Sequence, residues 1–162
     1  MRVEIQQLPA SQLAGFRLEG PWELTVPQGF SRLSEWVQRN GLKGEWLAVY
    51  HGNPQQMPAE RLQVDTGISV PSGFTLPPDS EGVQIRTIPA GCYAVSQVQV
   101  SDGDFAKPWR EFADEWLPGS GYQRADGPSY DRYLNNGSQT GTWDYLICVA
   151  VEKVRRTDPR LM

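Results

Sequence analysis

The chain has 162 residues, 39% of them hydrophobic, and its 15 Lys and Arg against 19 Asp and Glu give a formal net charge of -4. A chain of this length can bury the core of one domain, or of two small halves that share a core. The mildly acidic balance excludes the basic surface that contacts a nucleic-acid backbone and is too slight for a mimic of DNA, so we expect no direct nucleic-acid partner.

The first residues of the chain bear on its location. They read MRVEIQQ, without an apolar run behind Arg2, so the sequence predicts no secretory signal. No apolar stretch approaches the roughly 20 residues of a membrane-spanning helix. Cys92 and Cys148 fall in apolar, strand-like runs, and we expect them to be buried free thiols. These features predict a cytoplasmic protein with no membrane partner.

A segment typical of a strand followed by a turn occurs twice in the chain. Residues 3–10 read VEIQQLPA, and residues 83–90 read VQIRTIPA, 80 positions later. Residues 13–19 and 92–100 follow the two copies and alternate apolar and polar side chains, as half-buried strands do. We expect each half to begin with a hairpin that closes at its Pro-Ala turn.

An amphipathic helix is predicted next in each half. The first helix ends near Gly41 and carries an apolar stripe at Val26, Phe30, Leu33 and Val37. The second carries the same stripe 79 positions later, at Phe105, Trp109, Phe112 and Trp116. A competing alignment pairs residues 35–36 with 115–116. We prefer the stripe, because packing constrains a helix face more tightly than a dipeptide does.

Two further strands follow each helix, at 46–50 and 62–70 in the first half and at 130–134 and 143–151 in the second. The predicted fold is therefore α+β, with tandem duplicated strand-strand-helix-strand-strand units related by an internal pseudo-two-fold axis. Such a pair of units predicts a central cleft, where a ligand or a partner can bind.

The whole arrangement predicts a single domain over residues 1–152. Repeat one covers about 1–71, a linker 72–81 joins the halves, and repeat two covers about 82–152. Residues 153–162 form a basic tail without periodicity, which is typical of a solvated chain end. A duplicated chain already contains the interface that a dimer would supply, so we expect a monomer.

The usual signatures of catalysis and metal binding are missing. The sequence has no Gly-rich phosphate loop and no dinucleotide fingerprint, and its one histidine, His51, lies in a Gly-Asn-Pro turn. One His and two separated Cys do not make an ordinary zinc site, so we expect no metal, no cofactor and no catalytic residue. Asp65 and Asp144, 79 positions apart, are predicted to occupy corresponding places in their strands. They could meet across the axis, but hydrogen bonds with neighbouring loops are the favoured explanation.

Aromatic residues beside carboxylates are the remaining local signal for a ligand. The candidates for the cleft are Trp22, Trp46, Tyr93, Trp143 and Asp144. Ring faces together with an anion would suit a flat or cationic small molecule. The alternative is that most of these rings belong to the core, which is the commoner position of a single Trp.

Several longer strings resemble the bacterial DNA gyrase inhibitor family, the stand-alone branch of the GyrI-like small-molecule-binding superfamily. They are GPWE (20–23), WLAVY with GNP (46–54), PAERLQVDT (58–66), GFTLPPDSEGV (73–83), DFAKPW (104–109), YLNNG (133–137) and WDYLICVAV (143–151). The resemblance implies a tandem α+β fold and a cytoplasmic protein that binds DNA gyrase. It also implies that the protein restrains supercoiling and protects cells from gyrase-targeting toxins.

One position departs from the ligand-sensing branch of that superfamily. Many of those relatives place a glutamate in the last strand, four residues before a Pro or Ala, to meet cationic ligands. Here Leu146 stands four residues before Ala150, and Asp144 faces the same side of the strand. We add Leu146 to the cleft candidates. A small-molecule binder is the alternative to a gyrase inhibitor. A hydrolase of small strained substrates is a further alternative with less support, because hydrolytic relatives use the glutamate that this chain replaces with Leu146.

The turn at the start of the second half is a candidate contact with gyrase. The candidate residues are Ile88, Pro89, Ala90, Gly91, Cys92 and Tyr93. This segment is apolar, and its Pro and Gly leave it rigid and free of bulky side chains. The alternative is a plain hairpin turn without a binding role.

Overall fold

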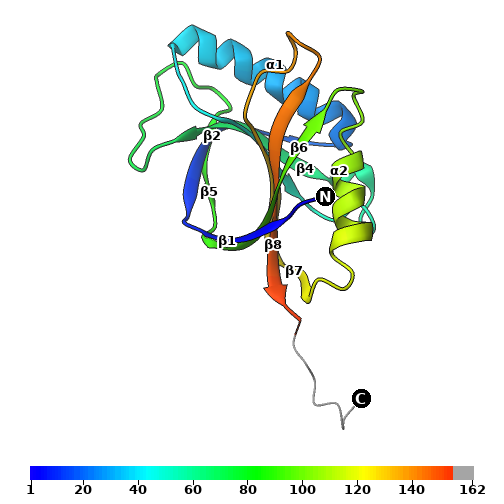
Figure 1. Cartoon of the computed structure of the whole chain (residues 1–162). Helices are drawn as coiled ribbons and strands as arrows, with labels where there is room; N and C mark the ends of the chain where they lie inside the picture. Colours follow the sequence, from blue (N-terminus) through cyan, green and yellow to red (C-terminus); the bar gives the residue numbers. More distant parts are fainter. Residues whose placement is uncertain (155–162) are drawn as a thin grey trace.

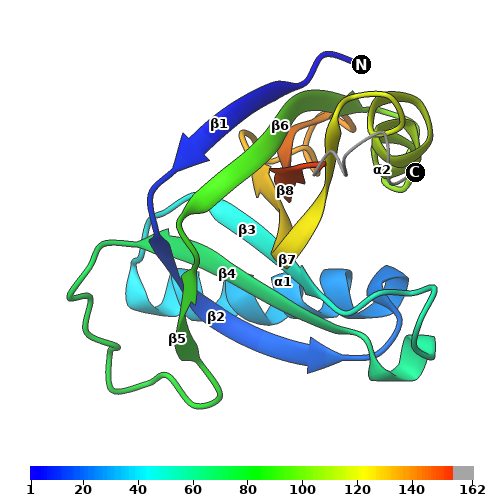
Figure 2. The same ribbon diagram turned by 90° about the horizontal axis from the view of Figure 1, so that it is seen from below.

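The computed structural model describes residues 1–154, which form one curved eight-stranded sheet with two helical regions (Figures 1 and 2). The first half contains β1 (Glu4–Leu8), β2 (Ser11–Glu19), α1 (Trp22–Asn40), β3 (Trp46–His51), a short 3-10 turn (Ala59–Arg61) and β4 (Gln63–Val70). The second contains β5 (Gln84–Ile88), β6 (Gly91–Val100), α2 (Lys107–Glu111), a π-helical turn (Phe112–Trp116), β7 (Tyr122–Tyr133) and β8 (Trp143–Lys153). The predicted α+β class is confirmed. The predicted basic tail lies, from residue 155 onward, outside the described residues.

The sheet is antiparallel throughout, in the order β1-β6-β8-β7-β3-β4-β2-β5. Strands β1, β2, β3 and β4 have β5, β6, β7 and β8 as their counterparts in the other half. When each strand is replaced by its counterpart, the result is the same strand order read from the other end of the sheet. The register agrees, because Ala14 pairs with Ile85 while Ala94, 80 positions later, pairs with Ile5. Strands β3 and β7 meet in the middle. A two-fold axis between them is the simplest geometric account of this order and register.

The expectation that each half opens with a hairpin is wrong. Strand β1 pairs with β6, and β5 pairs with β2, so the first strand of each half belongs to the sheet of the other half. A two-residue hairpin needs a positive φ at its centre, which Pro cannot adopt and which no non-glycine residue of the described chain adopts. The connections at Pro9-Ala10 and Pro89-Ala90 therefore carry the chain across to the other half.

Helix α1 packs on the sheet through a face slightly rotated from the predicted one. Its buried residues are Thr25, Gly29, Leu33 and Trp36, and the predicted stripe residues other than Leu33 lie at the edges of that face. Gly29 sets this rotation, since a Cβ built at that position would lie 2.3 Å from Oγ1 of Thr66 on β4. The missing side chain lets the helix backbone approach the sheet closely.

The second helical region is shorter than predicted and changes type. Helix α2 spans Lys107–Glu111, and the chain continues as a π turn in which the Leu117 amide donates to the Phe112 carbonyl at 2.9 Å. Phe112 is fully buried, whereas Phe105 precedes the helix and is 40% exposed. Within residues 1–154, no helix is both long and apolar enough to cross a membrane.

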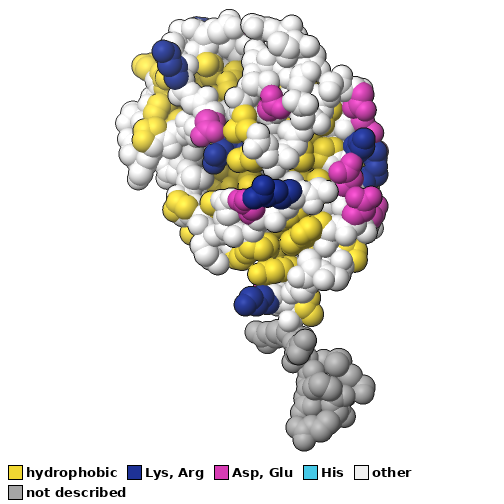
Figure 3. Space-filling model, in the orientation of Figure 1, with side chains coloured by type: hydrophobic (Ala, Val, Ile, Leu, Met, Phe, Trp, Pro, Cys, Tyr) yellow, Lys and Arg dark blue, Asp and Glu magenta, His cyan; other side chains and the backbone are white. Residues whose placement is uncertain are grey.

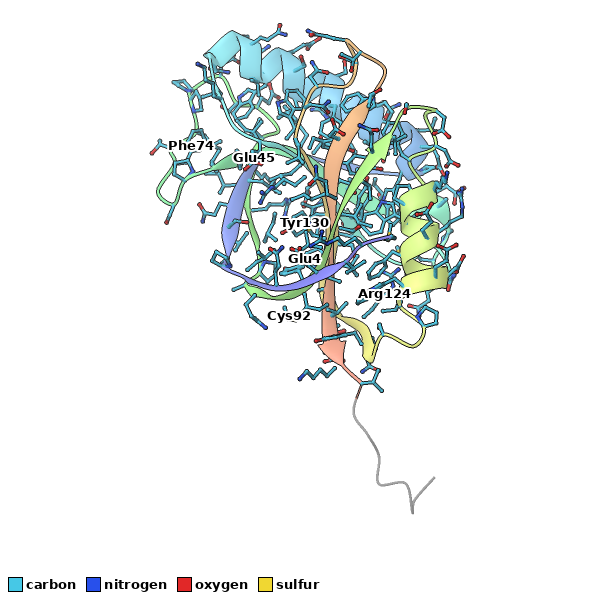
Figure 4. All side chains as sticks on the ribbon, viewed as in Figure 1. Glu4, Glu45, Phe74, Cys92, Arg124 and Tyr130 are labelled. Atoms are coloured by element: carbon cyan, nitrogen blue, oxygen red, sulfur yellow. The ribbon has the colours of Figure 1, made fainter. Side chains whose placement is uncertain are left out.

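The core is divided by the sheet. Under α1, residues such as Phe16, Leu33 and Trp36 form one cluster, and under α2 residues such as Phe112 and Ile147 form another. A third cluster fills the inside of the curve and includes Leu13, Val49, Tyr93, Tyr130 and Cys148. Figure 4 shows Tyr130 in this central position. Both helical regions therefore cover the outer, convex face of the sheet. Strands β3 and β7 form the middle of that face, between the two helical regions.

Candidate functional site

A buried carboxyl group lies at the middle of the outer face. Asp131 on β7 is only 3% exposed. The Tyr50 hydroxyl on β3 donates to Oδ2 of Asp131 at 2.6 Å, and the Tyr133 hydroxyl lies 3.5 Å from the same oxygen. Directly across the β3–β7 pairing stands Ala48, which is also fully buried.

The two tyrosines hold matching positions in the two halves. The β3–β7 register places Tyr133 opposite Trp46, Tyr50 opposite Ser129, and Asp131 opposite Ala48. The registers of β3 with β4 and of β7 with β8, combined with those of β2 with β4 and of β6 with β8, match each β3 residue with the β7 residue 83 positions later, so Tyr133 corresponds to Tyr50 and Asp131 to Ala48. The single acid therefore lies in the β3–β7 pairing at the middle of the sheet, where a hydroxyl from each half reaches it.

Aromatic rings pack on the two tyrosines that contact this acid, directly or through one another, and we call the set the axial aromatic cluster. Its members are Trp22, Phe30, Trp46, Tyr50, Phe105, Trp109, Tyr133, Trp143 and Tyr145. Each helical region contributes a ring to a tyrosine of the other half: Trp109 lies 5.8 Å from Tyr50, and Phe30 lies 5.4 Å from Tyr133, between ring centroids. These spacings are typical of favourable aromatic pairs.

The floor of the cluster has unused hydrogen-bonding capacity. Among the described residues, Oδ1 of Asp131 and the hydroxyl of Tyr145 are buried without a hydrogen-bond partner. Leaving such groups unsatisfied costs about 1–3 kcal/mol each, and most native proteins avoid it. A polar or cationic group that entered the cluster would recover that free energy.

The ionisation of Asp131 is poised near neutrality. Burial raises the pKa of its carboxyl to about 7, and the hydrogen bonds from Tyr50 and Tyr133 act in the opposite direction. Burial, and next the charge of Asp131, also raise the pKa of Tyr50 and of Tyr133, so both phenols stay protonated donors. A cation held by the surrounding rings would favour the charged form of the acid.

The residues that the sequence predicted for a cleft are divided between the two faces. Trp22, Trp46 and Trp143 belong to the cluster; the Trp22 indole N–H donates to the Gln63 carbonyl at 3.0 Å. Tyr93 and Leu146 instead pack inside the curve of the sheet. The prediction that all of these residues line one cleft is therefore wrong. Successive residues of a strand face opposite sides of the sheet, and the side chains of Tyr93 and Leu146 face the inner side.

Asp144 is also on the face away from the cluster. Its carboxylate accepts hydrogen bonds from Gln99 at 3.0 Å and from Asn135, in the β7–β8 loop, at 3.2 Å. The amide of Asp144 donates in turn to the Asn135 side chain. These bonds agree with the structural role favoured from the sequence.

Asp65 is the centre of a separate ion cluster. Its carboxylate is held by Arg17 at 2.7 and 2.8 Å, by His51 at 2.7 Å and by Arg86 at 3.3 Å. Burial alone would raise the pKa of Asp65, but hydrogen bonds from Arg17 and His51 hold it below its usual value. The residue corresponding to Asp65 is Leu146 and not Asp144, because Arg17 pairs with Asp65 while Gln97, 80 positions later, pairs with Leu146.

Only part of the predicted gyrase-contact segment is accessible. Ile88 and Tyr93 are buried at 3% and 2% exposure, whereas Pro89 and Ala90 are exposed. The Tyr93 hydroxyl donates to the Pro89 carbonyl at 2.7 Å. That bond fixes the exposed pair at the crossing between the halves. The plain hairpin considered from the sequence is absent, since β5 and β6 are not paired with each other.

Sequence reasoning missed the acid and most of the rings around it. Asp131 lies in the short polar run Asp131-Arg132, which reads as a solvated strand end. Its burial depends on the pairing of β7 with β3, a contact between segments 81 positions apart. The nearest signal in the sequence is the pair of matching tyrosines, Tyr50 and Tyr133, at the ends of their strands.

Known proteins resemble this chain in sequence, and others resemble it in fold. Residues 1–152 match the family described as the GyrI-like small molecule binding domain. The DNA gyrase inhibitor of Erwinia billingiae (strain Eb661) is 52% identical over 153 residues, covering 94% of this chain and 99% of the relative. The DNA gyrase inhibitor of Escherichia coli (strain K12) is 46% identical over 153 residues, covering 94% and 98%.

Two solved structures share the fold at low sequence identity. The EcmrR C-terminal domain superimposes with a TM-score of 0.70 at 15% identity, over 94% of this chain and 98% of that domain. SAV2435 bound to tetraphenylphosphonium gives a TM-score of 0.65 at 12% identity, over 94% of each chain. At these identities the likeness establishes the fold alone.

Proposed function

The chain belongs to the GyrI-like small-molecule-binding family, and we propose that it is a DNA gyrase inhibitor that binds gyrase and restrains its supercoiling activity. The observation that carries this proposal is the identity of 52% and 46% to two proteins named DNA gyrase inhibitor, over 99% and 98% of their lengths. In this role the protein works in the cytoplasm, as a monomer, and protects the cell from toxins that act on gyrase.

The proposed target is the enzyme and not its DNA. The net charge of -4 disfavours binding to the phosphate backbone of a nucleic acid. On the face shown in Figure 3, the Lys and Arg side chains are scattered among Asp and Glu and form no basic patch. Residues 1–152 act as one unit in this proposal, with repeats of about 1–71 and 82–152 joined by 72–81. No enzymatic activity, metal or cofactor is part of it. The only argument for hydrolysis of a small substrate is the similarity of the chain to hydrolytic relatives.

The exposed pair Pro89-Ala90 is the proposed point of contact with gyrase, with Gly91 and Cys92 beside it. The pair is fixed by the Tyr93 hydroxyl, so little conformational entropy is lost on binding. The first half offers a matched control, because Pro9-Ala10 occupies the corresponding crossing and is also exposed.

The experiment measures supercoiling of relaxed plasmid by gyrase at stoichiometric amounts of this protein. We expect the parent protein to suppress supercoiling, Ala90→Asp to need roughly tenfold more protein for the same effect, and Ala10→Asp to match the parent. Equal inhibition by the two variants would remove Pro89-Ala90 from the contact. Absence of inhibition and of binding to both gyrase subunits would disprove the function itself.

A second candidate function is the binding of a flat or cationic small molecule in the axial aromatic cluster. The unpartnered Oδ1 of Asp131 among the rings favours it. Tetraphenylphosphonium is a suitable probe, and at 100 times its dissociation constant it would stabilise the fold by about 2.7 kcal/mol. We expect Asp131→Asn to weaken binding roughly tenfold and Asp144→Asn to leave it unchanged. The opposite pattern, or no thermal shift with the parent, would count against the cluster as a site.

A further inference from the structure

The ion cluster around Asp65 holds more positive charge than its one carboxylate neutralises. Arg17 and Arg86 each place Nε on the same oxygen, Oδ1 of Asp65, at 2.7 and 3.3 Å. The imidazole of His51 lies on the other oxygen, with Nε2 2.7 Å from Oδ2. Because both guanidinium groups are always charged, two cations share one buried carboxylate, and an excess of positive charge remains.

The cluster lies on the inner face of the curved sheet, near one of its ends. Arg17 is four residues from Leu13 on β2, so both side chains face inward. Asp65 on β4 pairs with Arg17, and Arg86 on β5 pairs with Leu13. Figure 2 shows β2, β4 and β5 together at this end of the sheet. The axial aromatic cluster is on the opposite face, so the two places are separate.

The carboxylate of Asp65 has no capacity left for further donors. Arg17 approaches it with two N–H groups, Nε on Oδ1 at 2.7 Å and Nη2 on Oδ2 at 2.8 Å. Arg86 and His51 each add one nitrogen, which uses the about four lone-pair sites of a carboxylate. Nη2 of Arg17 also lies 3.2 Å from Nε2 of His51. A ring nitrogen that donates to Oδ2 cannot accept from Nη2, so donors crowd on a single acceptor.

The same three side chains have donors that no protein group uses. Within residues 1–154, Nη1 of Arg17, Nη1 of Arg86 and Nδ1 of His51 make no hydrogen bond. These side chains are 32%, 30% and 33% exposed, respectively, whereas that of Asp65 is 3% exposed. A dissolved molecule therefore meets the cations and their free N–H groups, while the carboxylate lies hidden beneath them.

The corresponding place in the second half carries no charge. The counterparts of Arg17, Asp65 and Arg86 there are Gln97, Leu146 and Gln6. The equivalent strands pair in the same register with these uncharged residues. The excess positive charge of the first half is thus not a requirement of the strand pairing.

One further carboxylate on β2 faces the same side. Glu19 lies two residues beyond Arg17 and is exposed. In the part of the chain that the structure describes, Glu19 forms no ion pair, and solvent screens its charge. It lowers the local excess of positive charge but leaves the free N–H groups of the cluster unused.

We infer that the ion cluster around Asp65 binds the phosphate group of a small molecule, with Arg17 and Arg86 on the phosphate oxygens. The planar fork of Arg matches phosphate geometry, and a phosphate has more acceptor oxygens than a carboxylate, which suits donors from three side chains. The ligand is either free inorganic phosphate or a small phosphate ester, since both present the same oxygens. Neither gyrase nor the axial aromatic cluster is part of this inference, so it stands apart from the proposed function.

NMR spectra of the nitrogen-15-labelled full chain test this inference at the Nε–H signals of the arginine side chains. We expect inorganic phosphate to shift the signals of Arg17 and Arg86, and to shift that of Arg39, in its exposed ion pair, no more than sodium chloride does at equal ionic strength. Equal shifts of Arg17 and Arg86 with the two salts would show screening alone and would overturn the inference. Absence of any shift with both inorganic phosphate and glycerol 3-phosphate would also overturn it.

The same titration distinguishes the two sources of the phosphate group. Binding of glycerol 3-phosphate roughly tenfold tighter than inorganic phosphate would support an ester as the ligand, through contacts of its organic part. Equal or weaker binding of the ester would support free phosphate. Either result keeps the phosphate site at the ion cluster around Asp65.

A pair of substitutions gives an independent test. Arg86→Gln introduces the residue that the second half has at this place, and Arg86 makes the longest of the contacts to Asp65, at 3.3 Å. We expect this variant to bind phosphate roughly tenfold more weakly with little change in its thermal midpoint. Arg39→Gln removes the same charge from an exposed pair and should bind as the parent does. Equal affinity of the two variants would overturn the inference and leave the proposed function standing, because gyrase is absent from the measurement.

Discussion

The Tyr50 hydroxyl and the Asp131 carboxyl form a 2.6 Å hydrogen bond between strands whose residues are 81 positions apart. This bond joins the two halves at the middle of the sheet, beside the axis suggested by the register. It also keeps a buried acid in contact with a donor from the opposite half. Two predictions concern this pair.

The first prediction is that Asp131 makes the fold less stable as pH rises. Burial raises its pKa to about 7 in the folded protein, above the 3.8 of the free carboxyl. Its contribution is therefore fully favourable below pH 4 and is lost as pH rises through 7. We expect the free energy of unfolding to fall by about 2–4 kcal/mol across that window.

Urea denaturation at several pH values between 4 and 8 measures this effect. The variant Asp131→Asn cannot ionise, so its stability should vary less over the same window and exceed that of the parent at pH 8. An equal slope in the two proteins would show that Asp131 does not carry the pH dependence.

The second prediction distinguishes the two tyrosines. Tyr50→Phe removes the 2.6 Å bond and should cost about 1–3 kcal/mol, while Tyr133→Phe removes only a 3.5 Å contact and should cost less than about 1 kcal/mol. The loss of the Tyr50 donor should also raise the pKa of Asp131. Denaturation curves give the first quantity, and NMR titration of the carboxyl carbon gives the second. Equal costs for both variants would contradict the geometry.

The elements of each half could be predicted from the sequence because their signals are local. Period-two alternation marks residues 13–19 and 92–100, and helical spacing marks the region of α1. The strand order and register agree with the correspondence drawn from the duplication at 3–10 and 83–90. The exchange of β1 and β5 was missed, although a Pro-Ala turn without a positive φ already disfavours a tight hairpin.

The candidate site was harder to predict, because it depends on pairing between halves. The burial of Asp131 follows from the β3–β7 register, and no local pattern reports that register. The tryptophans Trp22, Trp46 and Trp143 were found because large rings are conspicuous in any sequence. Tyr93 and Leu146 were assigned to the same cleft wrongly, since the faces of separate strands can be compared only once their register is known.

The third prediction concerns the approach of α1 to the sheet. A Cβ at Gly29 would lie 2.3 Å from Oγ1 and 2.7 Å from Cγ2 of Thr66, so Gly29→Ala must push the helix away from β4. We expect a loss of about 1–3 kcal/mol, despite the better helix propensity of Ala. The neighbouring exposed position provides the control, because Gln28→Ala should be nearly neutral. Thermal unfolding measures both, and an unchanged or higher midpoint for Gly29→Ala would contradict the close contact.

The fourth prediction concerns the ion cluster around Asp65, whose pKa is lowered in the folded protein. Its stabilising contribution is present above the unfolded pKa near 4 and is lost as pH falls below that value, the opposite direction to Asp131. Asp65→Asn should cost about 1–3 kcal/mol at pH 7, because Arg17, Arg86 and His51 lose a buried carboxylate but are themselves partly exposed.

The exposed ion pair between Arg39 and Asp79 is the matched control for that variant. Both of its side chains are more than half exposed, at 53% and 64%, so solvent screens their attraction. Asp79→Asn should therefore change the free energy of unfolding by less than about 1 kcal/mol. Equal effects of the two substitutions would mean that Asp65 is no better placed than a surface carboxylate. Its role in joining β2, β3 and β5 would then have to be abandoned.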